Sequence, residues 1–170
     1  PPDLISVLPE SARLPVESLL SQHRDVTIQW KGPRKARLGT YQAQPAPLIT
    51  LNSDLAPMPL LITLLHELAH HRVHEHYRRR QAPHGTAWKK AFAKLLREFA
   101  PYMEAKWQAA VLSHANSPKA TLGADLNFAR IMDGKEGELR LVDLDPGTAF
   151  RFKQRDFVAE EMRRTRRLCT

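Results

Sequence analysis

Apolar residues recur at helical spacing in two long stretches near the middle of the chain. In both, an apolar residue returns every three or four positions, which predicts two amphipathic helices. The stretches are residues 58–77 (MPLLITLLHELAHHRVHEHY) and 85–99 (GTAWKKAFAKLLREF). A shorter helix is predicted at 13–22, and Pro101 ends the second long helix before a further one at 102–113. We therefore expect the central part of the chain to be mainly helical.

Three short stretches before the long helices have the alternation and the β-branched content of strands. They are residues 26–30, 37–42 and 47–52. Because they follow one another closely, we expect a small meander within an antiparallel or mixed sheet. The stretch at 47–52 directly precedes the first long helix, and two roles are open for it: an ordinary core strand, or a strand that pairs with an extended substrate.

The last third of the chain is less regular. Residues 137–144 and 148–153 predict a terminal hairpin that turns at 145–147 (Asp-Pro-Gly). We therefore expect two parts, a core at 1–115 and an extension at 116–170 that carries a degenerate or truncated module.

Composition limits the class of protein. The chain has 170 residues, of which 42% are hydrophobic, so one domain with a sizeable core is expected. No window approaches the roughly 18 uncharged apolar residues of a membrane span, and no signal peptide is recognisable. The single cysteine, Cys169, excludes an intramolecular disulfide and a Cys-x-x-Cys zinc ribbon, and it fits a reducing compartment. We expect a monomeric cytoplasmic protein that can associate with the nucleoid.

Basic residues exceed acidic ones. The 26 Lys and Arg against 18 Asp and Glu give a net charge of +8, which favours a polyanionic partner, with nucleic acid as the leading candidate. Residues 78–97 contain no acid. The cations that we consider for contact with DNA, single-stranded or bound without sequence preference, are Arg78, Arg79, Arg80, Lys89 and Lys90. The alternative is that this run is only a solvated face.

A possible metal motif, HELAH at 66–70, lies inside the first long helix. On a helix, His66 and His70 are one turn apart and differ by about 40° in direction, so both imidazoles can reach one ion. Glu67 lies beside them, where it can hold a water molecule. The leucines of this helix fill its opposite half, so the histidines belong to a separate polar face. The alternative is that both are surface residues of an amphipathic helix.

A catalytic zinc site usually has three protein ligands, so a third residue is needed. His76 fits the spacing of the longer H-E-x-x-H-x-x-G-x-x-H pattern, but Val73 stands where that pattern requires glycine. His74 lies about 12 Å along the helix from His66, too far for one ion. A downstream Glu is a further option, although the segment after the helix contains no acid. We favour His84, since the chain can fold back there, just before the next helix.

The run at 63–92 as a whole resembles the SprT-like zinc metalloproteases, the family that includes the DNA–protein-crosslink protease Spartan. The resemblance covers about residues 5–115. The features that carry it are HELAH at 66–70, Pro-His-Gly at 83–85, Trp88 with Lys89, Arg37-Leu38-Gly39-x-Tyr41, and Ile49-Thr50-Leu51-Asn52.

This resemblance implies an α+β, zincin-like (minigluzincin-like) fold with a small sheet, an HExxH helix, further helices and a C-terminal β-hairpin. It implies one zinc ion per chain held by His66, His70 and His84, with Glu67 as the catalytic residue. The implied activity is zinc-dependent hydrolysis of peptide bonds in DNA-bound or DNA-crosslinked proteins. Many members add a Cys-rich zinc ribbon that this chain cannot form. It therefore looks like a bacterial-type member in which ribbon-dependent DNA contacts do not carry over.

Two alternative functions belong to other classes. One is a DNA-binding module whose zinc site is structural or silent, and the other is a cytosolic peptidase with no nucleic-acid role. Glu67 argues against the first, because a structural site gains nothing from a carboxylate that does not bind the metal. The basic charge argues against the second.

Overall fold

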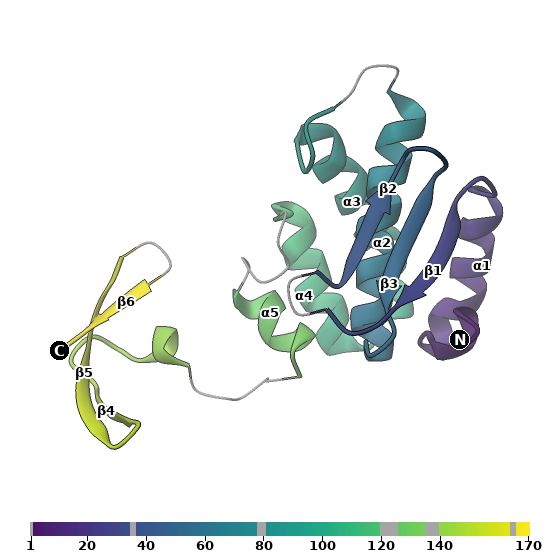
Figure 1. Cartoon of the computed structure of the whole chain (residues 1–170). Helices are drawn as coiled ribbons and strands as arrows, with labels where there is room; N and C mark the ends of the chain where they lie inside the picture. Colours follow the sequence, from purple (N-terminus) through teal and green to yellow (C-terminus); the bar gives the residue numbers. More distant parts are fainter. Residues whose placement is uncertain (1, 35–36, 78–80, 120–125, 135–139, 164–165) are drawn as a thin grey trace. The chain divides into compact units, whose positions relative to one another are not determined.

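The structure is a computed structural model of the chain (Figure 1). It describes residues 2–34, 37–77, 81–119, 126–134, 140–163 and 166–170. The chain forms two compact units, Pro1–Gly134 and Lys135–Thr170, which are described separately below.

Helices make up most of the first unit, at the positions that the sequence predicts. The α-helices are α1 (Arg13–Ser21), α2 (Pro57–His76), α3 (Thr86–Phe99), α4 (Ala105–Asn116) and α5 (Leu126–Met132), and short 3₁₀ turns lie at Ile5–Val7, Glu10–Ala12 and Ala100–Tyr102. Helix α5 has no counterpart among the predicted elements. Its Phe128 is buried and stacks on His114 of α4 with ring centroids 4.3 Å apart, so the first unit continues past the expected boundary at 115.

A mixed three-stranded sheet completes this unit. Strands β1 (Thr27–Lys31), β2 (Gly39–Gln42) and β3 (Leu48–Asn52) lie in the order β1-β3-β2, with β3 parallel to β1 and antiparallel to β2. The predicted meander is therefore wrong. The reason is that β3 is the most buried strand and needs neighbours on both edges, whereas β1 and β2 keep exposed positions that suit a sheet edge. Since both edges of β3 are paired, the alternative that 47–52 pairs with a substrate is also wrong.

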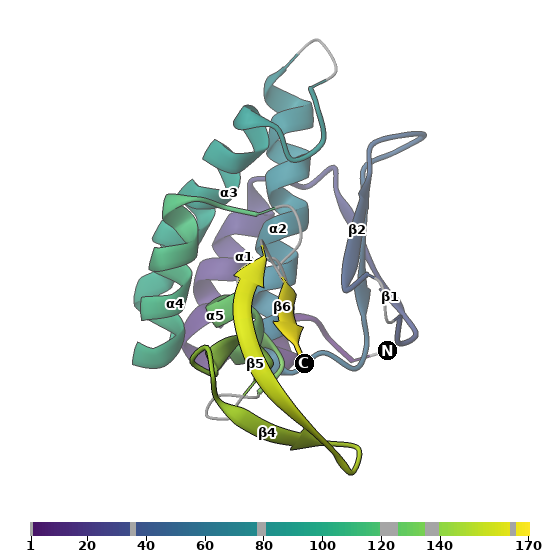
Figure 2. The ribbon, with the colours of Figure 1, turned by 90° about the vertical axis from the view of Figure 1, so that its left-hand side faces the viewer.

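Helix α2 lies between the sheet on one side and the helices α3 and α4 on the other (Figure 2). This position explains why the helix is buried continuously from Met58 to Ala69. The expected polar face exists, but it does not face solvent: Thr63, His66 and Glu67 are 2%, 9% and 6% exposed. The alternative that the two motif histidines are ordinary surface residues therefore fails for His66.

Helix α3 closes the core from the other side. Its apolar stripe, Trp88, Phe92, Leu95, Leu96 and Phe99, is buried, as its spacing predicts. Its cations lie on the opposite face, where Lys89, Lys90, Lys94 and Arg97 are exposed. The helix thus presents a basic outer surface while its inner surface packs on α2.

The second unit is a small antiparallel sheet in the order β4-β5-β6, formed by Ala149–Phe152, Arg155–Arg163 and Arg166–Cys169. The predicted pairing of 137–144 with 148–153 is not found in the described residues: β4 pairs with β5 instead, and this hairpin turns at Lys153 and Gln154, whose φ values of 48° and 64° suit a tight hairpin turn. The expected turn residues lead into β4 instead.

The predicted strand at 137–144 is wrong in its described part. Residues 137–139 lie outside the described residues, and Leu141–Asp143 form a 3₁₀ turn. The Asp143 carboxylate caps this turn by accepting a hydrogen bond from the Arg140 backbone N–H at 2.9 Å.

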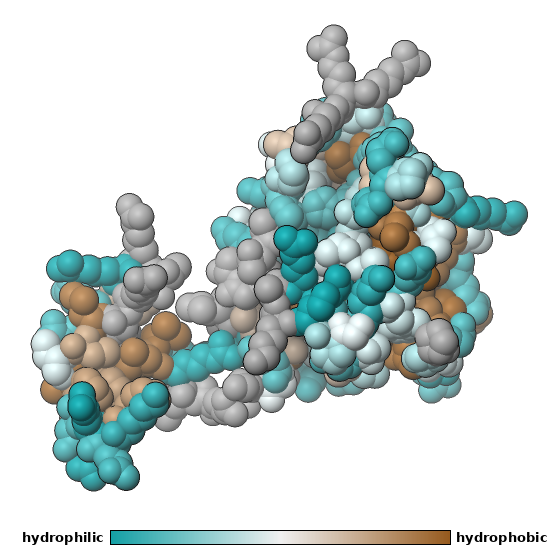
Figure 3. All heavy atoms as spheres, in the orientation of Figure 1, coloured by the Kyte–Doolittle hydropathy of each residue, from teal (hydrophilic) through white to brown (hydrophobic). Residues whose placement is uncertain are grey.

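Apolar side chains reach the surface of this small unit (Figure 3). The large exposed ones among the described residues are Leu141, Phe152, Val158, Met162 and Leu168. Among the described residues, no helix is both long and apolar enough to cross a membrane.

Candidate metal centre

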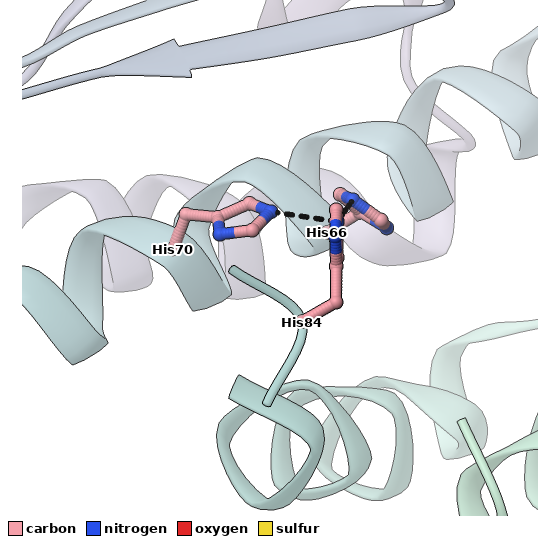
Figure 4. A group of neighbouring side chains, drawn as sticks. All are labelled: His66, His70 and His84. Carbon is pink, nitrogen blue, oxygen red and sulfur yellow. Dashed lines mark hydrogen bonds between the residues drawn. The ribbon is translucent and has the colours of Figure 1, made fainter. Parts of the chain in front are cut away.

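Three histidines meet on the covered face of α2 (Figure 4). His66 and His70 project from adjacent turns of the helix, and His84 reaches them from the loop before α3. The Nε2 atom of His84 lies 3.2 Å from Nε2 of His66 and 3.1 Å from Nε2 of His70. The structure thus brings together the three histidines that the sequence singles out.

The loop before α3 has the shape needed to aim His84 at α2. His84 has a φ of 56°, in the left-handed region that few residues other than glycine adopt. The next residue, Gly85, donates its N–H to the Ala82 carbonyl at 3.0 Å, and a Cβ at Gly85 would lie only 3.0 Å from that oxygen. The Pro-His-Gly sequence therefore forms a tight turn that folds the chain back onto α2.

Aromatic rings enclose the histidines. The Trp88 ring lies 4.7 Å from the His66 ring, 5.4 Å from that of His70 and 4.6 Å from that of His84, between centroids. Its indole Nε1–H donates to the His66 carbonyl at 3.3 Å. The His66 Nδ1 atom is buried and has no hydrogen-bond partner among the described residues, so packing against Trp88 and Phe92 sets the orientation of its ring.

Burial keeps the three imidazoles neutral. It lowers the pKa of His66 to about 3 and that of His70 to about 4, with a smaller contribution from the neighbouring histidines. Burial also lowers the pKa of His84. Neutral imidazoles offer lone pairs, which is the form that binds a transition metal.

Glu67 lies on the side of α2 that faces β2. Gly39 of β2 crosses so close to it that a Cβ there would lie 2.9 Å from Glu67 Oε1 and 2.7 Å from Thr63 Cγ2. Burial raises the pKa of Glu67 to about 8, while the charge of Arg34 and a hydrogen bond from the Tyr41 backbone N–H act in the opposite direction. Glu67 is thus a buried carboxylate held between α2 and the edge of the sheet.

Arg34 is fixed in place by β3. Its Nε donates to Asn52 Oδ1 at 2.7 Å, and a terminal nitrogen donates to Thr50 Oγ1 at 3.2 Å. Asn52 Nδ2 donates in return to the Arg34 carbonyl at 3.0 Å. This network holds a positive charge near the Glu67 carboxylate.

The rejected ligand candidates lie apart from this centre. His74 and His76 are exposed on the last turn of α2 and do not join the three histidines. Of the predicted DNA contacts, Lys89 and Lys90 are exposed on α3, and residues 78–80 lie outside the described residues.

Several residues that shape the centre were not predicted as functional. Gly39, Tyr41, Thr50 and Asn52 entered the sequence analysis only as part of the resemblance, and Arg34 did not enter it as a site residue. The signal that could have found Gly39 is its place in a strand, where glycine is unfavourable unless another group approaches closely. Nothing local in the sequence predicts that Arg34 approaches Glu67.

The donor set fits a divalent transition metal. Ligand atoms about 2.1 Å from a tetrahedral zinc ion lie roughly 3.4 Å from one another, close to the nitrogen spacings seen here. Two of the three histidines and the Glu67 carboxylate come from a helix that packs against a small sheet, an arrangement typical of zincin-like metallopeptidases.

Comparison with known proteins agrees with this class. The SprT-like family model matches residues 14–109, which is more than half of the chain. The chain therefore belongs to the SprT-like family, a family associated with metallopeptidase activity. No curated protein and no solved structure matches the chain.

Proposed function

We propose that the chain is a zinc-dependent endopeptidase in which His66, His70 and His84 hold the metal and Glu67 is the catalytic residue. The main support for this proposal is the position of the three histidines: Nε2 of His84 lies 3.2 Å from Nε2 of His66 and 3.1 Å from Nε2 of His70. The residue after His66, Glu67, adds a buried carboxylate. Membership of the SprT-like family supports it.

The mechanism follows from the chemistry of these residues. When bound, zinc supplies a Lewis acid beside the scissile carbonyl and lowers the pKa of a neighbouring water. Glu67 accepts the proton of the attacking water at a carboxylate oxygen and returns it to the leaving amine nitrogen, so that water is added across the peptide bond. The Tyr41 N–H and the Gly39 backbone hold this carboxylate in place. Trp88 packs against all three imidazole rings and Phe92 against that of His66, which holds these rings in position.

Strand β2 is suited to align an extended substrate. It is an edge strand of the sheet, and within the described residues no strand pairs with its outer edge. It also carries Gly39, which lies against Glu67. A peptide that adds to this edge as a further strand would pass the catalytic residue.

We propose further that the protein substrates are bound or crosslinked to DNA and that the enzyme acts as a monomer. The support for a DNA-directed role is the net charge of +8 and the acid-free run at 78–97, which includes His84. Lys89 and Lys90 are exposed on the helix that begins directly after His84. Phosphate contacts made there would keep DNA near the metal centre.

The enzymatic part of this proposal is tested with Glu67→Gln. The variant should keep the fold and the zinc but hydrolyse an unstructured protein about 10² to 10⁴ times more slowly than the wild type, because Gln cannot take up the proton. Zinc content and circular dichroism of both proteins serve as controls. Peptidase activity at the wild-type level in Glu67→Gln would remove the proposed mechanism.

The DNA-directed part is tested with a triple change of residues 78–80 from Arg to Ser. The logarithm of the binding constant for single-stranded DNA should fall less steeply with the logarithm of the salt concentration. The slope should decrease in magnitude by up to about 2, because each phosphate contact contributes roughly 0.7 to it. Cleavage of a DNA-tethered protein should fall more than cleavage of a free peptide. The matched control changes Arg151, Lys153 and Arg155 to Ser, which removes the same charge from the exposed hairpin. If only the control flattens the slope, the DNA contacts lie in the C-terminal unit instead.

A further inference from the structure

A second group of side chains that could bind a metal lies beside α2, next to the three histidines described above. His71 follows His70 directly in the sequence but is fully buried on a different side of the helix. Its Nε2 lies 3.3 Å from Asp25 Oδ1 and 3.5 Å from Glu75 Oε2, and the same Glu75 oxygen lies 2.9 Å from His23 Nδ1. The ligand atoms of His23, His71 and Glu75 all lie within 4.8 Å of one another.

Ordinary hydrogen bonding does not account well for this group. His23 is 9% exposed and His71 is 0% exposed. Their Nδ1 and Nε2 atoms approach carboxylate oxygens, yet within the described residues neither nitrogen makes a well-oriented hydrogen bond. Buried polar atoms without a well-oriented hydrogen bond are rare, and leaving one unsatisfied lowers stability. The ligand atoms of these buried histidines and of Glu75 lie close enough together to surround one metal ion instead.

The spacings also fit a metal. Contacts of 2.9 to 3.5 Å between ligand atoms bracket the roughly 3.4 Å edge of a tetrahedral zinc site with bonds near 2.1 Å. Tyr41 Oη lies 3.3 Å from His71 Nδ1. With its proton on Nδ1, His71 donates to this hydroxyl and turns the Nε2 lone pair towards the carboxylates, as metal-binding histidines usually do.

Arg72 is a positively charged group beside these ligands, and its contact with His23 has to be compatible with a bound metal. Its Nε lies 3.4 Å from His23 Nε2, a long contact, and its guanidinium also lies 3.6 Å from a Glu98 carboxylate oxygen. When His23 carries its proton on Nε2 and presents the Nδ1 lone pair to a metal, Arg72 loses its contact with His23. It can still keep its ion pair with Glu98. The carboxylates of Glu75 and Asp25 offset the positive charge of a bound cation.

We propose that His23, His71 and Glu75, with Asp25 as an adjacent carboxylate, form a second site for a divalent transition metal of the zinc type. The donors are two imidazole nitrogens and carboxylate oxygens, a set that suits zinc. The site is structural: it ties the loop between α1 and β1 to the C-terminal half of α2. It thereby fixes α2 at the residue next to His70.

The test is a metal count on the full chain. The protein is stripped with a chelator and dialysed against a small excess of zinc, and bound zinc is counted by elemental mass spectrometry. The wild type should bind two zinc ions per chain, and Glu75→Gln should bind one. The Glu75 side chain is 38% exposed, so its replacement by Gln leaves the core intact. The control, Glu17→Gln, makes the same charge change at an exposed position of α1 and should keep both ions.

A second measurement separates this site from the proposed catalytic one. In His84→Ala, zinc should still raise the melting temperature, because a metal that binds only the folded state stabilises it. The double variant His84→Ala/Glu75→Gln should lose that rise. If the wild type binds one zinc ion and Glu75→Gln binds the same number, the second group is only a set of ion pairs and the proposal is overturned. Peptidase activity is not needed for either readout.

Discussion

Two histidine groups lie on neighbouring positions of α2, and the chain assembles them in different ways. His66 and His70 lie one helical turn apart on the same helix, so their spacing in the sequence already places them together. His71 meets His23 only because the loop after α1 packs on α2. A local spacing is visible in a sequence without a structure, whereas a contact between distant segments is not.

The two groups also differ in the charge that they offer. The first contains three neutral imidazoles, and its neighbouring carboxylate, Glu67, is held by β2. Such a set leaves a coordination position for water, as catalytic sites require. The second group includes carboxylates beside both histidines, which suits a closed structural site. The chemistry that each group can support with a metal therefore depends on where its carboxylates lie as well as on its histidines.

The largest effect that tests this difference is expected for His84→Ala. Removing the third nitrogen should release one zinc ion per chain and reduce peptidase activity to background, since two imidazoles hold zinc weakly. Metal content and peptidase rate are measured together. His76→Ala, which changes an exposed histidine on the same helix, should match the wild type. Loss of zinc in His76→Ala but not in His84→Ala would show that the third ligand is misassigned.

An intermediate effect is expected for Gly39→Ala. The new Cβ would lie 2.7 Å from Thr63 Cγ2 and 2.9 Å from Glu67 Oε1, so β2 or the carboxylate must move. We expect a loss of about 1 to 3 kcal/mol in the free energy of unfolding and a fall of up to about 10²-fold in kcat, with zinc retained. Gly32→Ala is the matched control, because a Cβ there meets nothing within 4 Å. Equal kcat values for the two variants would rule out the proposed support of Glu67 by β2.

The smallest effect is expected for Trp88→Phe. The change keeps an aromatic ring against the histidines but removes the indole hydrogen bond to the His66 carbonyl. The free energy of unfolding should fall by about 1 to 3 kcal/mol. Zinc should bind more weakly at His66, His70 and His84, while binding at His23, His71 and Glu75 is unaffected. Trp30→Phe removes an indole that donates to the Pro2 carbonyl and should leave zinc binding unchanged. Chemical denaturation and zinc titration of both variants provide the comparison.

The sequence predicts the helices of the first unit well because their apolar spacing is local. It also brings His66, Glu67 and His70 to one part of a helix, and the Pro-His-Gly turn makes His84 a reasonable partner. Their role as ligands stays a prediction. Strand order was not predictable, because the parallel pairing of β1 with β3 depends on burial of β3 from both sides.

Three further features were missed for related reasons. Helix α5 is short and is held by contacts such as that between Phe128 and His114. The hairpin turn at Lys153 and Gln154 has no glycine or proline to mark it. The second histidine group requires a segment from before the sheet to meet the end of α2, and no spacing within one element encodes that contact.

Anomalous diffraction at the zinc edge, from crystals of the wild-type protein grown with zinc, locates the metal directly. We expect a peak about 2.1 Å from the Nε2 atoms of His66, His70 and His84, with the Glu67 carboxylate outside the bonding distance of the metal. No peak at these three histidines, or a peak whose third ligand is His74, His76 or Glu67, would contradict this expectation.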